Sequence, residues 1–237
     1  MTVFATIVEL TLRALLGRRR TVLLALLAAL PVLVALLARL SGRTPGEAAL
    51  FDAMVRTVLP LVALVFGTSA LGSELEDGTA VYILAKPIRR SQVILAKAAV
   101  AGSLTGGLVV ASTLGSGLLA GGNLPTTVAF AVAAAVAAFA YVSLFLAASV
   151  FTGRALILGL IYTLIWEGAL AGILEGTRQF SIREATLSLA GALAPAGSGI
   201  EGGLDLAGAV GLFVVVIVGG LALATWRLAR WEVRGSD

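Results

Sequence analysis

Residues 21–40 read TVLLALLAALPVLVALLARL and carry a single charge, on Arg39. A helix needs about 20 apolar residues to cross the hydrocarbon core of a bilayer. A helix that is apolar on every side also finds no place on the surface of a soluble protein. We therefore predict a membrane-spanning helix here. A kink is expected at Pro31, because proline removes one helical hydrogen bond.

The whole chain has the composition of an integral membrane protein. Of its 237 residues, 59% are hydrophobic and 13% are charged, whereas a soluble domain has roughly 25% charged residues. Cysteine and histidine are absent, which excludes disulfides, His-Cys zinc sites, HExxH metalloproteases and Ser-His catalytic pairs. The GxxxxGK(S/T) phosphate loop is absent too. We expect a non-enzymatic chain with no cofactor or metal of its own and no nucleic-acid partner.

The predicted fold class is all-α, a polytopic membrane protein with six membrane-spanning helices. Residues 1–20 are expected to form an amphipathic helix along the membrane interface, and residues 21–237 to form the membrane domain. The six spans are expected at about 21–40, 50–72, 91–121, 125–151, 155–174 and 206–228.

Three local features refine this prediction. Glu9 and Arg13 are four residues apart, as are Asp52 and Arg56, so each pair can form an ion pair across one helical turn. Ser91 is a plausible N-cap for the third span, because serine side chains accept hydrogen bonds from the first turn of a helix.

The basic residues distinguish the two sides of the membrane. Most of the 17 lysines and arginines share one side if the N-terminus, segment 73–97, Arg154 and the C-terminal tail lie there. Because loops rich in lysine and arginine stay in the cytoplasm, both termini are predicted to be cytoplasmic. The stretch 175–205 is then an extracytoplasmic loop, in which a short helix at about 183–193 is expected to lie on the outer surface. A bacterial or archaeal cell (inner) membrane, with its lipids as neighbours, is the expected location.

Segment 73–97 is the most informative part of the sequence. Acidic residues precede the short apolar run 80–85 (AVYILA), and basic residues follow it. Six helical residues rise only about 9 Å, so the run cannot span a bilayer. A helix this apolar needs cover on two faces, and the membrane surface supplies one of them. A second protein is the favoured source of the other cover, although an ordinary charged loop is the alternative.

These residues resemble the permease subunits of type-2 ABC transporters, the ABC-2 family. The likeness lies in Leu59-Pro60, in GSELEDGT at 72–79, in LAKPIRRS at 84–91 and in LAK at 95–97. The resemblance implies a half-transporter that pairs with a second permease, identical or homologous, and with separate ATPase subunits that hold ATP and Mg. It also implies that a coupling helix at about 79–85 docks in a groove of the ATPase.

The resemblance also assigns roles to individual residues. Tyr82, Ile83 and Leu84 would fill the ATPase groove. Salt bridges from four charged residues would orient the contact: Glu74, Glu76, Arg89 and Arg90. The predicted ATPase-coupling set is completed by Glu74, Glu76, Asp77, Gly78, Lys86, Pro87, Arg89 and Arg90.

Glu167 is the second candidate, because a charge near the middle of a span costs about 2.5–3.5 kcal/mol. It must therefore face protein or a water-filled cavity. Glu167 either lines the translocation pathway and binds a proton or substrate, or it holds neighbouring helices together. Tyr162 and Trp166, four residues apart, are either pathway aromatics or packing residues.

The resemblance implies an exporter driven by partner ATPases, because the ABC-2 family mostly exports. One alternative is a proton-coupled secondary transporter that uses Glu167 as its relay. Another is a membrane scaffold that transports nothing.

Overall fold

The computed structural model describes residues 3–42, 47–78, 88–170, 175–200 and 202–230. Every regular element in these ranges is helical, which confirms the all-α class there. The elements are α1 (Val3–Leu15), α2 (Arg18–Leu40), α3 (Glu47–Ala53), the π-helix η1 (Met54–Val58), α4 (Leu59–Ser69), α5 (Gly72–Glu76), α7 (Arg90–Leu119), α8 (Leu124–Phe151), α9 (Ala155–Ile161), the π-helix η2 (Tyr162–Leu170), the 3-10 helix η3 (Glu175–Phe180), α11 (Ile182–Leu193) and α12 (Leu206–Ala229).

Five helical stretches of the described residues are long and apolar enough to cross a membrane. They are Thr21–Leu40, Ala49–Leu75, Arg90–Leu119, Leu124–Phe151 and Leu206–Ala229. These agree with the first four predicted spans and the last one. The predicted span at 155–174 coincides with a shorter apolar helix, Ala155–Gly168. The total of six spans therefore stays a prediction.

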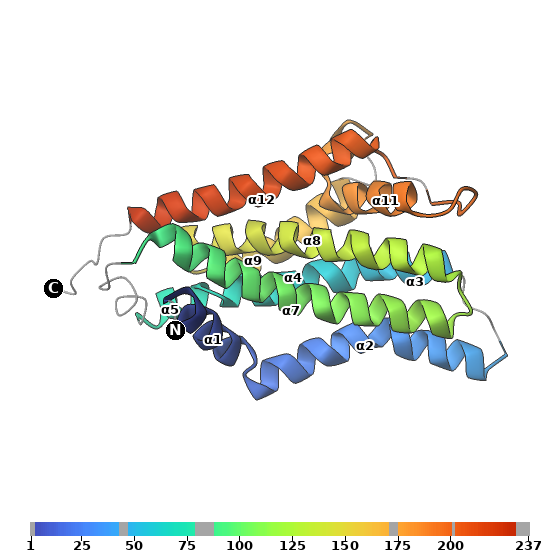
Figure 1. The fold of residues 1–237 in the computed structure, drawn as a ribbon, viewed down its shortest axis with the longest axis horizontal. Helices are drawn as coiled ribbons and strands as arrows, with labels where there is room; N and C mark the ends of the chain where they lie inside the picture. The colour runs from blue at the N-terminus through green and yellow to red at the C-terminus, as the bar shows by residue number, and fades with distance from the viewer. Residues whose placement is uncertain (1–2, 43–46, 79–87, 171–174, 201, 231–237) are drawn as a thin grey trace.

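The long helices form one elongated bundle with α8 at its centre (Figure 1). α8 packs against α7, α4, α12 and α11. At one end, called here the α5 end, lie α1, α5, the start of α7 and the last turns of α8 and α12; α3 marks the opposite end. α2 and α12 lie at opposite edges of the bundle, and few of their side chains are buried. Lipid or another subunit must cover these apolar edges.

Small residues allow the central helices to approach closely. Alanines of α8 such as Ala133, Ala137 and Ala140 are fully buried. A Cβ added at Gly102 of α7 would come within 2.5 Å of the Phe139 ring of α8. Close contact between small residues is how helices associate in lipid, where the hydrophobic effect does not drive them together. The glycines and alanines of these two spans therefore set the spacing of the bundle.

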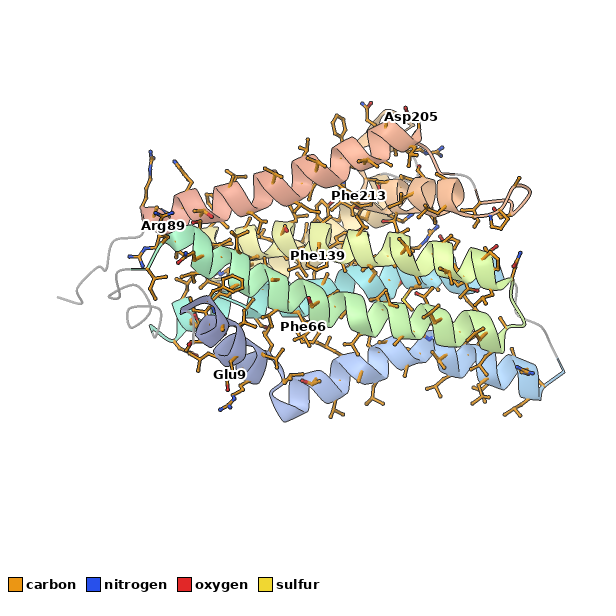
Figure 2. All side chains as sticks on the ribbon, viewed as in Figure 1. Glu9, Phe66, Arg89, Phe139, Asp205 and Phe213 are labelled. Atoms are coloured by element: carbon orange, nitrogen blue, oxygen red, sulfur yellow. The ribbon has the colours of Figure 1, made fainter. Side chains whose placement is uncertain are left out.

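Local predictions had mixed outcomes. The Glu9–Arg13 pair is confirmed at 2.5 Å, on the outside of α1, where Figure 2 shows Glu9 pointing away from the bundle. The Asp52–Arg56 pair is confirmed at 3.1 Å. Ser91 as an N-cap was wrong: α7 begins at Arg90, and no side chain caps it.

The predicted surface helix at 183–193 also needs correction. α11 spans Ile182–Leu193, but it packs against α8 and α12 instead of lying on the surface. Ile182, Ala185 and Ala190 are fully buried. The reason is that its polar first turn finds hydrogen-bond partners inside the protein, as described below.

Candidate functional site

α5 is the described part of the predicted coupling segment, at one end of the bundle. It continues α4 after a break at Leu71, whose φ of −133° departs from helical geometry. It ends at Glu76, and Gly78, two residues later, has a φ of +69° that L-residues with a Cβ rarely adopt. Asp77 and Gly78 are exposed. The predicted groove residues Tyr82, Ile83 and Leu84, together with Lys86 and Pro87, lie outside the described residues, and for Glu76 only the backbone is described.

Lys97 ties α5 to α7. Its side chain is 1% exposed, and Lys97 Nζ donates to Glu74 Oε1 at 2.7 Å and to the carbonyl of Ala70 at 2.6 Å. Ala70 is the C-cap of α4, so this carbonyl has lost its place in the helical ladder. Lys97 therefore forms an ion pair with the Glu74 carboxylate and donates a hydrogen bond to the carbonyl of Ala70 at the break between α4 and α5.

Of the remaining members of the predicted coupling set, Arg89 is exposed and Arg90, the first residue of α7, is half-buried. Arg89 precedes α7, and Figure 2 shows it near the end of α12. Arg227 of α12 lies 5.8 Å from the ring centre of Phe151, and Arg230 lies 4.2 Å from that of Trp226. Arginines from two helices thus gather at the α5 end, as the charge pattern of the sequence predicted for one side of the membrane.

A small cavity separates α5 from the turn between α8 and α9. It has a volume of about 120 Å³ and a lining that mixes hydroxyl-bearing and apolar residues. The lining residues are Thr68, Ser69, Gly72, Ser73, Ser149, Thr152, Gly153, Ala155 and Leu156. α5 therefore joins α7 through the Lys97 contact, and it packs against α8 beside this cavity.

Glu167 lies in a second polar site, between η2 and the start of α11. Its side chain is buried, and four groups of the described residues donate to its carboxylate. Tyr162 Oη at 2.9 Å and the N–H of Ile182 at 3.0 Å reach Oε1. Ser181 Oγ at 2.5 Å and the N–H of Arg183 at 3.4 Å reach Oε2. The carboxylate thus accepts from the first turn of α11, where negative charge is favoured by the helix dipole.

Two further residues extend this network to the start of α12. Arg183 donates to the backbone carbonyl of Glu167 at 3.1 Å and forms an ion pair with Glu184 at 2.9 Å. Glu184 Oε2 accepts from the N–H of Gly203 at 3.3 Å, and Ser188 Oγ accepts from that of Leu204 at 3.0 Å. The network therefore joins η2, α11 and the segment that leads into α12.

Of the predicted pathway residues, the structure brings Tyr162 and Glu167 together. Trp166 is half-buried on the same π-helix. Sequence reasoning missed the partners of Glu167 in α11. One signal was present: Ser181-Ile-Arg-Glu184 has the spacing of a capping box, and Ser181 Oγ does accept from the N–H of Glu184 at 3.1 Å.

Comparison with known families agrees with the coupling-segment motifs. Residues 16–176, more than half of the chain, match a family described as ABC-2 family transporter protein. The chain belongs to the ABC-2 transporter family. No curated protein matches it. The resemblance seen in residues 59–97 is thereby confirmed, and the chain is an ABC-2 type permease.

The matched region contains α5, Lys97 and Glu167. It ends before α11, so the partners of Glu167 in Ser181–Arg183 lie beyond it. Permeases of this family are generally non-catalytic membrane subunits, and membership implies association with ABC ATPase subunits.

Proposed function

We propose that this ABC-2 permease is the membrane half of an ATP-driven exporter. Two copies, or this chain and a homologous one, form the pathway, and separate ATPases bind the segment around 73–97 from the cytoplasm. Both termini lie on that side of a bacterial or archaeal cell membrane. The chain performs no covalent chemistry. It converts closure of the ATPase dimer into a change in which side of the membrane the pathway faces.

The observation that carries this proposal is the family match over residues 16–176. The α5 end adds physical support. It collects arginines from α7 and α12, as expected for a cytoplasmic face. It also presents the exposed end of α5, at Asp77 and Gly78, directly before the predicted coupling helix at 79–85.

The surroundings of Glu167 favour a structural anchor over the proton relay of a secondary transporter. An ionised carboxylate only accepts hydrogen bonds, and the four groups around Glu167 include two backbone N–H groups that can only donate. The arrangement therefore links η2 to α11 through the hydrogen bonds that this carboxylate accepts.

Co-purification with an ATPase tests the proposal. The permease, expressed with the ATPase encoded beside it and extracted in mild detergent, is expected to retain that ATPase and to raise its ATP hydrolysis. Leu84→Asp should reduce ATPase binding about 10-fold or more, because a charge replaces an apolar side chain at the centre of the predicted contact. Leu84→Met, which conserves volume and apolar character, is the matched control and should bind normally.

Three outcomes would contradict the proposal. Transport without any bound nucleotide-hydrolysing subunit would favour the proton-driven alternative. Equal binding and equal ATPase stimulation by Leu84→Asp and Leu84→Met would remove the coupling role of the segment. A complex with no transport of any kind would leave the membrane scaffold.

A further inference from the structure

The Lys97–Glu74 ion pair is placed where the proposed coupling segment meets the membrane bundle. Lys97 lies seven residues, or about 10 Å, inside α7, too deep to serve as an ordinary surface charge. Its ammonium group contacts α5 through Glu74 and the end of α4 through Ala70. A single side chain of α7 thus contacts both sides of the break at Leu71.

α5 depends on contacts with other elements, among them α4 and α8, to hold its position. A helix of five residues cannot sustain itself, because forming the first turn fixes several residues for one hydrogen bond. Leu75 adds an apolar contact to the core. On the α8–α9 side the cavity of about 120 Å³ leaves α5 incompletely packed. The contact with Lys97 adds a directed, charged attachment of α5 to α7.

We propose that Lys97 is a positioning residue that fixes α5 to α4 and α7, so that force applied to the coupling segment reaches the bundle. The inference rests on the proposed function. α5 leads directly to Gly78 and the segment that follows, and α4 and α7 pack against α8. With the attachment in place, a displacement of the coupling segment moves α5 together with α4 and α7. Without it, the break at Leu71 acts as a hinge and absorbs the displacement.

The partial exposure of the pair fits this role. The side chain of Glu74 is 25% exposed and that of Lys97 is 1% exposed. Glu74 therefore has access to solvent at the edge of the bundle, whereas Lys97 is enclosed. A buried charge without its partner is strongly unfavourable, so the pair resists separation when α5 is pulled. The attachment is therefore expected to keep α5 joined to α7 when the coupling segment is displaced.

The first test compares Lys97→Met with the parent permease in the complete complex with its ATPase. Methionine keeps the length and bulk of the side chain and removes its charge and donors. ATPase binding is expected to persist, whereas stimulation of ATP hydrolysis should fall at least about fivefold, the lower range of coupling between sites. Glu74→Gln should lose less stimulation than Lys97→Met, because its amide oxygen still accepts a hydrogen bond from Lys97. If Lys97→Met does not fold, Glu74→Gln is measured in its place.

A control at the other end of the bundle distinguishes a loss of positioning from a general loss of stability. Phe51 of α3 stacks on Phe130 of α8 with 4.3 Å between ring centres. Phe51→Leu should lower the melting temperature without lowering stimulation, because it lies far from α5. A loss of stimulation in Phe51→Leu equal to that in Lys97→Met would show that stability alone is measured, and would overturn the inference.

The decisive experiment restores the attachment by other means. A Cβ built at Gly72 of α5 lies 3.3 Å from the Cβ of Ser149 in α8, near the separation that a disulfide requires. Because the chain has no native cysteine, Gly72→Cys with Ser149→Cys creates one defined disulfide. In the Lys97→Met background, oxidation should restore stimulation, and reduction should abolish it again.

Each remaining outcome separates the inference from the function on which it rests. Three results would overturn the positioning role alone. The first is normal stimulation of ATP hydrolysis in Lys97→Met. The others are a disulfide that forms without restoring stimulation, and cysteines that form no disulfide on oxidation. Failure of the parent chain to bind or stimulate any ATPase would instead overturn the proposed function.

Discussion

Replacing Glu167 by glutamine tests whether the network at the start of α11 holds the protein together. The substitution keeps the size of the side chain and exchanges one acceptor oxygen for an NH₂ group. In the parent, each carboxylate oxygen accepts from a backbone N–H, that of Ile182 on Oε1 and that of Arg183 on Oε2. Whichever way the amide is turned, one of these N–H groups faces another donor. The variant therefore leaves a buried donor unsatisfied.

The expected loss follows from these contacts. An unsatisfied buried donor costs about 1–3 kcal/mol, and the missing negative charge at the N-terminus of α11 adds about 0.3–1 kcal/mol. A loss of 1 kcal/mol lowers the melting temperature of a protein of this size by about 2–4 °C. Glu167→Gln should therefore melt several degrees below the parent permease.

Thermal unfolding in detergent at one fixed scan rate measures this effect, with tryptophan fluorescence as the signal. Trp166 adjoins the substituted position and reports on it directly. Glu9→Gln is the matched control, because Glu9 makes an exposed i, i+4 pair worth about 0.3–0.5 kcal/mol. If Glu167→Gln melts no lower than Glu9→Gln, the carboxylate does not anchor α11, and its role must be sought in the transport pathway.

Two further predictions concern packing and surface charge. Gly102→Ala should destabilise the bundle by about 1–3 kcal/mol, because its Cβ would meet the Phe139 ring at 2.5 Å. Gly107→Ala is the control and should be neutral or slightly stabilising, because no atom lies within 4 Å of its Cβ. Equal melting temperatures for the two variants would refute the close contact. Asp52→Asn should cost less than about 1 kcal/mol, since its pair with Arg56 is nearly half exposed, and a larger loss would indicate a role beyond this pair.

The positions of most long helices were predictable from local sequence. A bilayer requires about 20 apolar residues whatever their packing, so five spans are visible as hydrophobic runs. The pairs Glu9–Arg13 and Asp52–Arg56 were predictable for a similar reason, because the geometry of one helical turn sets their distance. The span at 155–174 was harder to define, since its residues form a short α-helix followed by a π-helix.

The two polar sites were only half visible in the sequence. Glu167 stands out as a charge inside an apolar span, where a charge must have a partner. Lys97 was visible only as part of the LAK motif at 95–97, and its buried ion pair was not predicted. Their partners lie far along the chain: Glu74 is 23 residues from Lys97, and Ser181 is 14 residues from Glu167. No periodicity relates such positions. The prediction that α11 lies on the surface failed for the same reason, because its polar first turn is paired within the bundle.

By itself, the sequence determined a helical membrane protein of the ABC-2 family with a charged segment between its second and third spans, because hydrophobic length and local motifs are properties of neighbouring residues. Only the tertiary structure decided that Lys97 joins the two sides of the break after α4, and that Glu167 caps α11 from another segment. The physical reason is that a buried charge can be satisfied by any donor or acceptor within reach, and helix packing alone determines which one is there.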